Sequence, residues 1–160
     1  MLSMSALLRC WFASSAEVPG HSGGASAAKL VQQVTIDEAD SMIAFLELAI
    51  AAWGRDVEGY RLWGNLNLSL CMWLYRRLVI TPYSPRTPKL SKDMFQKCLM
   101  SIAADGQYAD WLVGRLLSER DRSPAYGRLK AIIARRLEAE TGKKPSLPSP
   151  AWSGHSFRTR

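Results

Sequence analysis

LWGNLNLSLCMWLYRRLVI, residues 62–80, makes up most of the longest apolar stretch of the chain, which runs from residue 60 to residue 80. Residues 65–70 alternate asparagine or serine with leucine, a period of two that is typical of a strand. The whole stretch is nevertheless about twenty residues long, rich in leucine and methionine, and continues into residues 73–77 at helical spacing. We therefore predict a buried helix here and keep a strand as the alternative.

A membrane span is not expected in this stretch. Its apolar part, residues 62–75, lies between Arg61 and Arg76 and is shorter than the roughly 20 residues that cross a bilayer. At the N-terminus Arg9 interrupts the apolar pieces, and no charged region precedes a sustained apolar one, so we predict no signal peptide. These features predict no membrane partner, and the three widely separated cysteines, Cys10, Cys71 and Cys98, predict a reducing cytoplasm.

Capping signals on both sides of this stretch predict further helices. Residues 35–38, Thr-Ile-Asp-Glu, form a capping box, in which the Thr hydroxyl accepts from an amide three residues on and the Glu reaches back. The helix that follows has its body at residues 39–53 and stops at Gly54. Three prolines within residues 82–88 forbid helix continuation. Beyond them we expect helices from Ser91 to about Gly106, over residues 108–116, and from the Ser123-Pro124 pair to Thr141.

Composition predicts the domain organisation. The Gly- and Ser-rich segment near the N-terminus is typical of a flexible linker, and the Pro- and Ser-rich C-terminus cannot bury enough apolar surface to offset its ordering entropy. We expect a short N-terminal helix at 1–14, a flexible linker at 15–25, a helical domain at 26–142 and a disordered basic Pro/Ser-rich tail at 143–160. The predicted fold class is all-α, an irregular bundle of about five to seven helices with a disordered C-terminal tail.

The net charge of +7 lies almost entirely at one end of the chain. Residues 1–114 hold ten Lys/Arg and ten Asp/Glu, whereas residues 115–160 hold eleven Lys/Arg and four Asp/Glu. An anionic partner is therefore expected for the C-terminal third, and nucleic acid is the commonest such partner. The candidate nucleic-acid-binding residues are Arg115, Arg120, Arg122, Arg128, Lys130, Arg135, Lys143 and Lys144.

The last predicted helix has one basic and one apolar face. Arg128 and Arg135 are seven residues apart and share a face, which lets them point outward together toward successive phosphates. The apolar face contains Tyr126, Leu129, Ile132, Ile133 and Leu137. The alternative is a solvated basic face with no partner, because no recognition helix with short polar side chains for base edges is visible.

Arg136 falls inside this apolar face, so it must either pair with a carboxylate or extend to the edge of the face. We predict a structural ion pair. The candidate partners are Asp110 and Asp93.

No constellation typical of an enzyme is present. His21 and His155 both fall in segments expected to be mobile, and the carboxylates are scattered. The sequence has no Gly-rich phosphate loop and no nucleophile elbow. Its three cysteines are widely separated and odd in number, which argues against a disulfide framework and a Cys-based metal site. We expect no catalytic residues, no metal and no cofactor.

Two segments resemble a known family. Residues 62–74, LWGNLNLSLCMWL, and residues 121–126, DRSPAY, look like parts of the helical region that follows the N-terminal ParB/DGQHR-type domain in some bacterial mobile-element proteins. The resemblance covers residues 1–153 in register. Residues 105–108, Asp-Gly-Gln-Tyr, match only three letters of the family motif and lack its His-Arg, so no family site residue is carried over. The resemblance implies a detached C-terminal half whose activity is absent or depends on a missing N-terminal domain.

Two hypotheses of function follow. The first is a non-catalytic accessory domain that binds nucleic acid without base specificity through its basic C-terminal helix, in a DNA-maintenance or mobile-element system. The second is a helical protein-interaction or oligomerisation module whose basic surface serves only solubility and whose apolar faces complete a partner's core.

Overall fold

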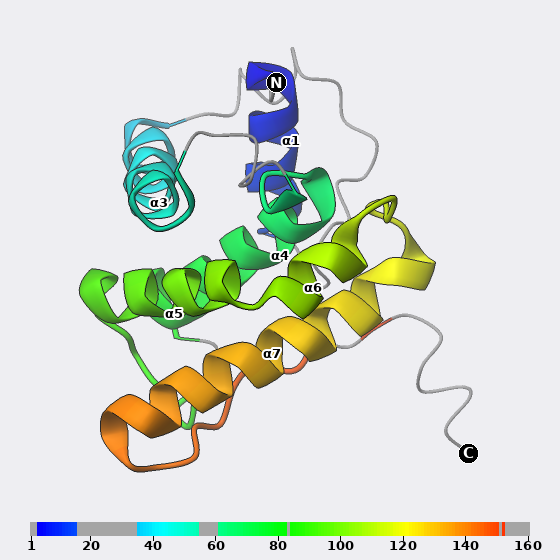
Figure 1. The fold of residues 1–160 in the computed structure, drawn as a ribbon. Helices are drawn as coiled ribbons and strands as arrows, with labels where there is room; N and C mark the ends of the chain where they lie inside the picture. The colour runs from blue at the N-terminus through cyan, green and yellow to red at the C-terminus, as the bar shows by residue number, and fades with distance from the viewer. Residues whose placement is uncertain (1–2, 16–34, 55–60, 83, 151, 153–160) are drawn as a thin grey trace.

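The computed structural model describes residues 3–15, 35–54, 61–82, 84–150 and 152, and within these ranges it is all-helical (Figure 1). Six α-helices and one π-helical turn are present, and none of the described residues lies in a β-strand. The all-α prediction is therefore confirmed. The predicted short helix at 1–14 is α1 (Met4–Ala13), whereas nearly all of the predicted linker at 15–25 and the residues just after it lie outside the described residues.

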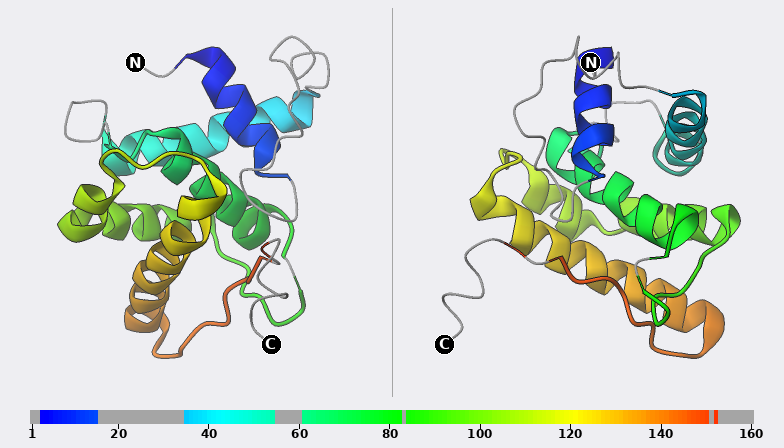
Figure 2. Two further views of the ribbon diagram at one scale, coloured as in Figure 1. Left: turned by 90° about the vertical axis from the view of Figure 1, so that its right-hand side faces the viewer. Right: turned by 180° about the vertical axis from the view of Figure 1, so that it is seen from behind.

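The apolar stretch forms the centre of the fold. It is helical, as α4 (Asn65–Tyr75) followed directly by the π-helical turn η2 (Arg76–Ile80), so the strand alternative is wrong. Every α4 residue after Asn65 is buried, which explains why the stretch lacks the one-sided pattern of a surface helix. In Figures 1 and 2, α4 lies between α1 and α7, while α3 packs directly against α5, which in turn packs against α7.

Aromatic side chains join α4 to its neighbours. Tyr75 packs edge-on against Phe45 of α3 (Ile36–Trp53) and against Phe95 of α5 (Lys92–Ala104), at centroid distances of 5.5 Å and 5.3 Å. Trp73 contacts Tyr126 of α7 (Glu119–Thr141) in the same edge-on geometry, at 5.7 Å. These rings are all buried, so one continuous core stabilises the described helices.

The N-terminal helices begin where the capping residues predict. Ser3 accepts from the Ala6 amide of α1, and Thr35 accepts from the Glu38 amide of α3, each at 3.1 Å. The second half of the predicted capping box differs, because the Glu38 carboxylate bonds elsewhere. Its Oε2 accepts from the Trp11 indole at 2.6 Å and from the Arg76 guanidinium at 3.2 Å.

Arg76 connects three elements of the fold. Its guanidinium lies 3.9 Å above the centroid of the Trp11 ring and donates to the Ser14 hydroxyl at 2.7 Å and to the Trp11 carbonyl at 2.9 Å. Burial lowers the pKa of Arg76, and the Glu38 carboxylate offsets part of that shift. The network fixes α1 and α3 to the end of the central helix.

The C-terminal layer contains α5, α6 (Gly106–Leu112) and α7. Ser91 caps α5 as predicted, through a 3.1 Å bond from the Met94 amide, and Asp105 caps α6 through a 3.0 Å bond from the Tyr108 amide. Helix α7 ends at the left-handed Gly142, also as predicted. The helix predicted over residues 108–116 stops earlier, at Leu112.

The predicted start of the last helix is wrong. Helix α7 begins at Glu119 after Ser118, and Pro124 lies inside it instead of opening it. Proline at this position removes one backbone amide, which would otherwise pair with the carbonyl of Arg120 four residues earlier. Asp121 supports this first turn by accepting from the Leu116 amide at 3.3 Å.

The C-terminal segment is irregular, as expected, and packs along α7 (Figure 2). Of the predicted tail at 143–160, the structure describes residues 143–150 and 152. Leu147 is buried, the Tyr126 hydroxyl donates to the Pro148 carbonyl, and the Trp152 ring lies 6.0 Å from the Tyr126 ring. These apolar contacts offset the ordering entropy that composition alone suggested would keep the segment unfolded.

Leu147→Ala is expected to lower the free energy of unfolding by about 2 kcal/mol, because it removes a buried leucine side chain from the face of α7. The exposed neighbour Ser146 provides a control, since Ser146→Ala is expected to stay within about 0.5 kcal/mol of the parent. Urea denaturation followed by circular dichroism measures both. Equal stability of the two variants would contradict the packed tail.

Candidate nucleic-acid interface

Two of the predicted basic residues meet on one tryptophan. The guanidinium carbon of Arg115 lies 4.2 Å from the centroid of the Trp111 ring, and that of Arg128 lies 4.6 Å from the same centroid. The two guanidinium carbons are therefore at most about 9 Å apart, which is close enough for them to contact neighbouring phosphates of one strand. We call Arg115, Arg128 and Trp111 the arginine–tryptophan centre.

A glycine turn places Arg115 on this ring. Gly114 has a φ of 77°, in the left-handed region that favours glycine, and it reverses the chain directly after α6. Arg115 then donates from Nε to the Trp111 carbonyl at 2.9 Å and from Nη1 to the buried Asp121 carboxylate at 3.5 Å. The turn and the carboxylate hold the Arg115 side chain against the indole.

The tryptophan itself is anchored to the core through Tyr108. Its ring stacks on the Tyr108 ring at an interplanar angle of 17° and a centroid distance of 6.4 Å. The Tyr108 hydroxyl donates to the buried Asn67 amide oxygen at 2.7 Å. Burial raises the pKa of Tyr108 well above its ordinary value, so the hydroxyl stays a donor.

Arg120 and Arg135 are also exposed residues of α7, and Arg135 shares the helical face of Arg128 seven residues before it. Arg135 is 71% exposed and pairs with Asp105 at 3.3 Å, and Arg120 is 89% exposed and lies 3.9 Å from Asp121. Arg128 and Arg135 are about 10 Å apart along the helix axis, at about 1.5 Å per residue. Exposed ion pairs of this kind contribute little, so these arginines can exchange their acidic partners for phosphates.

The remaining four predicted residues lie elsewhere. Lys130 faces the C-terminal segment and donates to the Ser149 hydroxyl at 3.0 Å, while Lys143 and Lys144 are exposed beyond the end of α7. Arg122 is only 8% exposed and lies 4.0 Å from Glu119, because its helical position faces the core. The expectation that Arg122 contacts nucleic acid from the protein surface is therefore at odds with its burial.

Arg136 forms the predicted structural ion pair with a different partner. Its Nη2 lies 3.0 Å from Glu140 one helical turn on, and its Nη1 donates to the Ser101 hydroxyl of α5 at 3.3 Å. The candidate partners Asp110 and Asp93 were wrong, and Asp110 instead pairs with Arg61. Glu140 is the nearest available acid because side chains four residues apart on a helix lie on the same face.

Sequence reasoning missed Trp111 as part of the site. Trp11, Trp53 and Trp73 are buried as core residues, but Trp111 is half-buried and Trp63 likewise. The signal was the spacing, because Arg115 follows Trp111 by four residues and a cation four residues on can reach an aromatic ring.

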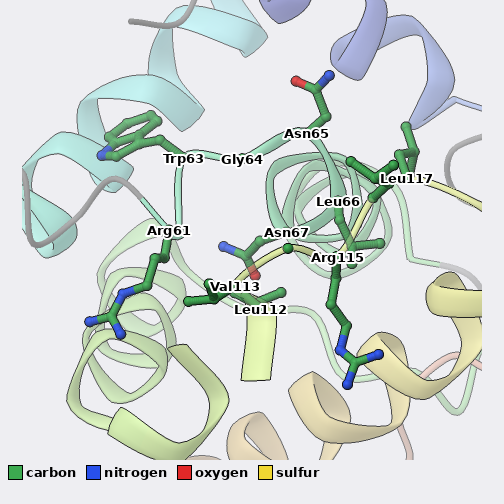
Figure 3. A pocket seen from close by; sticks show the side chains of 12 residues that line it. Arg61, Trp63, Gly64, Asn65, Leu66, Asn67, Leu112, Val113, Arg115 and Leu117 are labelled. Carbon is green, nitrogen blue, oxygen red and sulfur yellow. The ribbon is translucent and has the colours of Figure 1, made fainter. Parts of the chain in front are cut away.

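A pocket of about 550 Å³ lies beside the centre, between the start of α4 and the loop after α6 (Figure 3). Leu66, Asn67 and Leu112 lie around its middle in this view, and Arg61 and Arg115 extend from opposite sides of it. None of the described residues that line it is acidic.

The described part of the chain contains neither a cluster of metal-ligating side chains nor an exposed thiol. No group of three or more His, Cys, Asp or Glu side chains is placed to hold a metal ion among the residues that the structure describes. Cys10, Cys71 and Cys98 are free and buried. None of the described helices combines the length and apolar character that crossing a bilayer requires.

The three thiols are expected to resist labelling in the folded protein. Burial raises the pKa of Cys10 and Cys71, and it raises the pKa of Cys98 to about 12. Little thiolate therefore forms at about pH 8, and a disulfide reagent should label the cysteines rapidly only in denaturant. Because the pKa of Cys98 is higher in the folded than in the unfolded protein, its neutral thiol also contributes to the free energy of unfolding. This contribution is complete below about pH 9 and is lost as the pH rises toward 12. Rapid labelling of the native protein at about pH 8 would contradict the buried placement.

No family model, no curated protein and no solved structure matches this chain. The resemblance to the helical region of ParB/DGQHR-type proteins therefore stays a prediction from residues 62–74 and 121–126.

Proposed function

We propose that this protein binds nucleic acid without base specificity through Arg115, Arg120, Arg128 and Arg135, with the arginine–tryptophan centre as the main anion-binding point. The observation that carries the proposal is the convergence of two guanidinium groups on the Trp111 ring. A guanidinium stacked on an aromatic face can still donate its N–H groups to a phosphate oxygen. Arg128 is exposed and can do so, whereas Nε and Nη1 of Arg115 already donate to the Trp111 carbonyl and to Asp121.

Stacking also reduces the cost of binding. An arginine side chain loses rotamer freedom when it is fixed on a ligand, and the loss is about 2 kcal/mol at most. Arg115 and Arg128 are already ordered on Trp111, and the hydrogen bond from Arg115 to the Trp111 carbonyl adds to this order. Phosphate contacts of this type position a nucleic acid and carry no sequence information.

Binding of a labelled duplex of arbitrary sequence, measured by fluorescence anisotropy over a salt series, tests the proposal. Four phosphate contacts predict a straight line of log K against log salt with a slope of about −3 to −4. Absence of binding at the lowest salt, or affinity that does not change with salt, would contradict it.

We also assign the protein to the cytoplasm. Three buried free thiols are compatible with a reducing compartment, in which they need no pairing. A role in DNA maintenance or in a mobile element is the context that the ParB-like resemblance suggests.

A further inference from the structure

The pocket between α4 and the α6–α7 loop has an apolar rim that the proposed nucleic-acid binding does not use. Val113 is 64% exposed and Leu116 is 73% exposed, and both line the pocket. Large apolar side chains exposed together beside a cavity are typical of a protein-binding surface.

We infer that this pocket is a docking site for a segment of a partner protein that inserts an apolar side chain and carries acidic residues beside it. The volume of about 550 Å³ is within the range of pockets that enclose small ligands, and Leu66 and Leu112 supply an apolar floor. The exposed Val113 and Leu116 then become buried against the inserted side chain.

Charge complementarity selects an acidic partner. Arg61 and Arg115 lie on opposite sides of the pocket, and no carboxylate is among the described residues that line it (Figure 3). Arg115 already pairs with Asp121, so Arg61 is the cation that an acidic partner would engage. Arg61 pairs with Asp110, which is 77% exposed, so a partner carboxylate can replace this weak surface pair. A second copy of this chain fits less well, because the chain carries a net charge of +7.

A nucleic-acid base fits the pocket less well than a peptide. Unpaired bases are usually held by stacking on aromatic faces. The aromatic residue that lines the pocket, Trp63, points away from its middle in Figure 3 and packs edge-on against Trp53 at 5.2 Å. The pocket is therefore our proposed location for the protein interaction that the sequence suggested as its second hypothesis.

Selection of random short peptides displayed on phage against the full chain tests this docking site. The selected peptides are expected to share a large apolar residue flanked by Asp or Glu. A synthetic copy of the strongest binder, measured by titration calorimetry, should lose about thirtyfold in affinity with Leu116→Asp, the loss typical of a hot-spot residue. Arg61→Gln should weaken binding several-fold.

Two exposed residues away from the pocket provide matched controls. Ile36→Asp places the same acid at a position that is 81% exposed, and Arg86→Gln removes the same charge from an exposed loop. Both control variants should bind the peptide as the parent does. Circular dichroism verifies that Leu116→Asp, at an exposed position, leaves the fold intact.

Three results would overturn the docking site. The first is that the selected peptides are basic. The second is that the Leu116→Asp and Ile36→Asp variants bind the peptide equally well. The third is that a single-stranded oligonucleotide displaces the peptide and that its own binding is lost with Leu116→Asp. Duplex binding through Arg128 is measured separately, so the docking site and the proposed function can fail independently.

Discussion

The double variant Arg128→Ala/Arg135→Ala is expected to bind duplex DNA about one hundredfold more weakly than the parent at low salt. Each charge-assisted hydrogen bond to a phosphate contributes about 1.5 kcal/mol or more, and two of them correspond to about two decades in affinity. Among the described residues Arg128 takes part in no ion pair, and Arg135 has only its exposed pair with Asp105. Both side chains can therefore engage phosphates fully.

The salt dependence of this variant is as informative as its affinity. Loss of two phosphate contacts should reduce the slope of log K against log salt by about two. The matched control is Arg86→Ala/Lys89→Ala, which removes the same charge from exposed positions in the loop before α5. Anisotropy titrations of both variants make the comparison. Equal losses in the two would show that net charge, and not the α7 surface, controls binding.

Arg76→Ala is expected to lower the free energy of unfolding by about 2 kcal/mol, because it breaks a partly buried ion pair and leaves the acceptors of its hydrogen bonds unpaired. Its side chain is only 13% exposed and bonds to the Ser14 hydroxyl, the Trp11 carbonyl and the Glu38 carboxylate. The variant also loses the contact with the Trp11 ring, so the packing of α1 should loosen first.

Urea denaturation measured by tryptophan fluorescence and by circular dichroism tests this expectation. Arg9→Ala on the exposed side of α1 is the control and should stay within about 0.5 kcal/mol of the parent. If Arg76→Ala were as stable as Arg9→Ala, the network would be only a surface feature, and α1 would be held by apolar packing alone.

Much of the helical framework could be predicted from local signals. Ser3, Thr35 and Ser91 each accept from the amide three residues on, and Gly142 ends α7, because caps depend only on neighbouring residues. The apolar stretch was ambiguous in period because its α4 part is buried almost all round, and its length decided correctly for a helix.

Tertiary contacts explain where local signals failed. Glu38 belongs to a capping box by sequence, yet its carboxylate bonds to Trp11 and Arg76 from distant parts of the chain. Pro124 looked like a helix start, but Asp121 stabilises an earlier turn through the Leu116 amide. Trp11 and Arg76 lie far from Glu38 in sequence, and Leu116 lies five residues before Asp121, so none of these contacts falls within the three-residue span of a capping rule.

The candidate site was predicted in part. Spacing placed Arg128 and Arg135 on one exposed face, whereas the convergence of Arg115 and Arg128 on Trp111 needs the turn at Gly114. Arg122 lies before the predicted start of the last helix, so periodicity could not place it; its burial follows from the earlier start of α7 at Glu119. Net charge pointed to the C-terminal third of the chain, but it does not predict that the cations there lie on different surfaces of the protein.

The indole N–H resonances of the six tryptophans test the central claim most directly when a short duplex is added to the isotope-labelled protein. If phosphates bind the two arginines on Trp111, its resonance should shift during the titration while those of the buried Trp11, Trp53 and Trp73 stay fixed. An unchanged Trp111 resonance in a titration that shows binding by anisotropy would contradict the account.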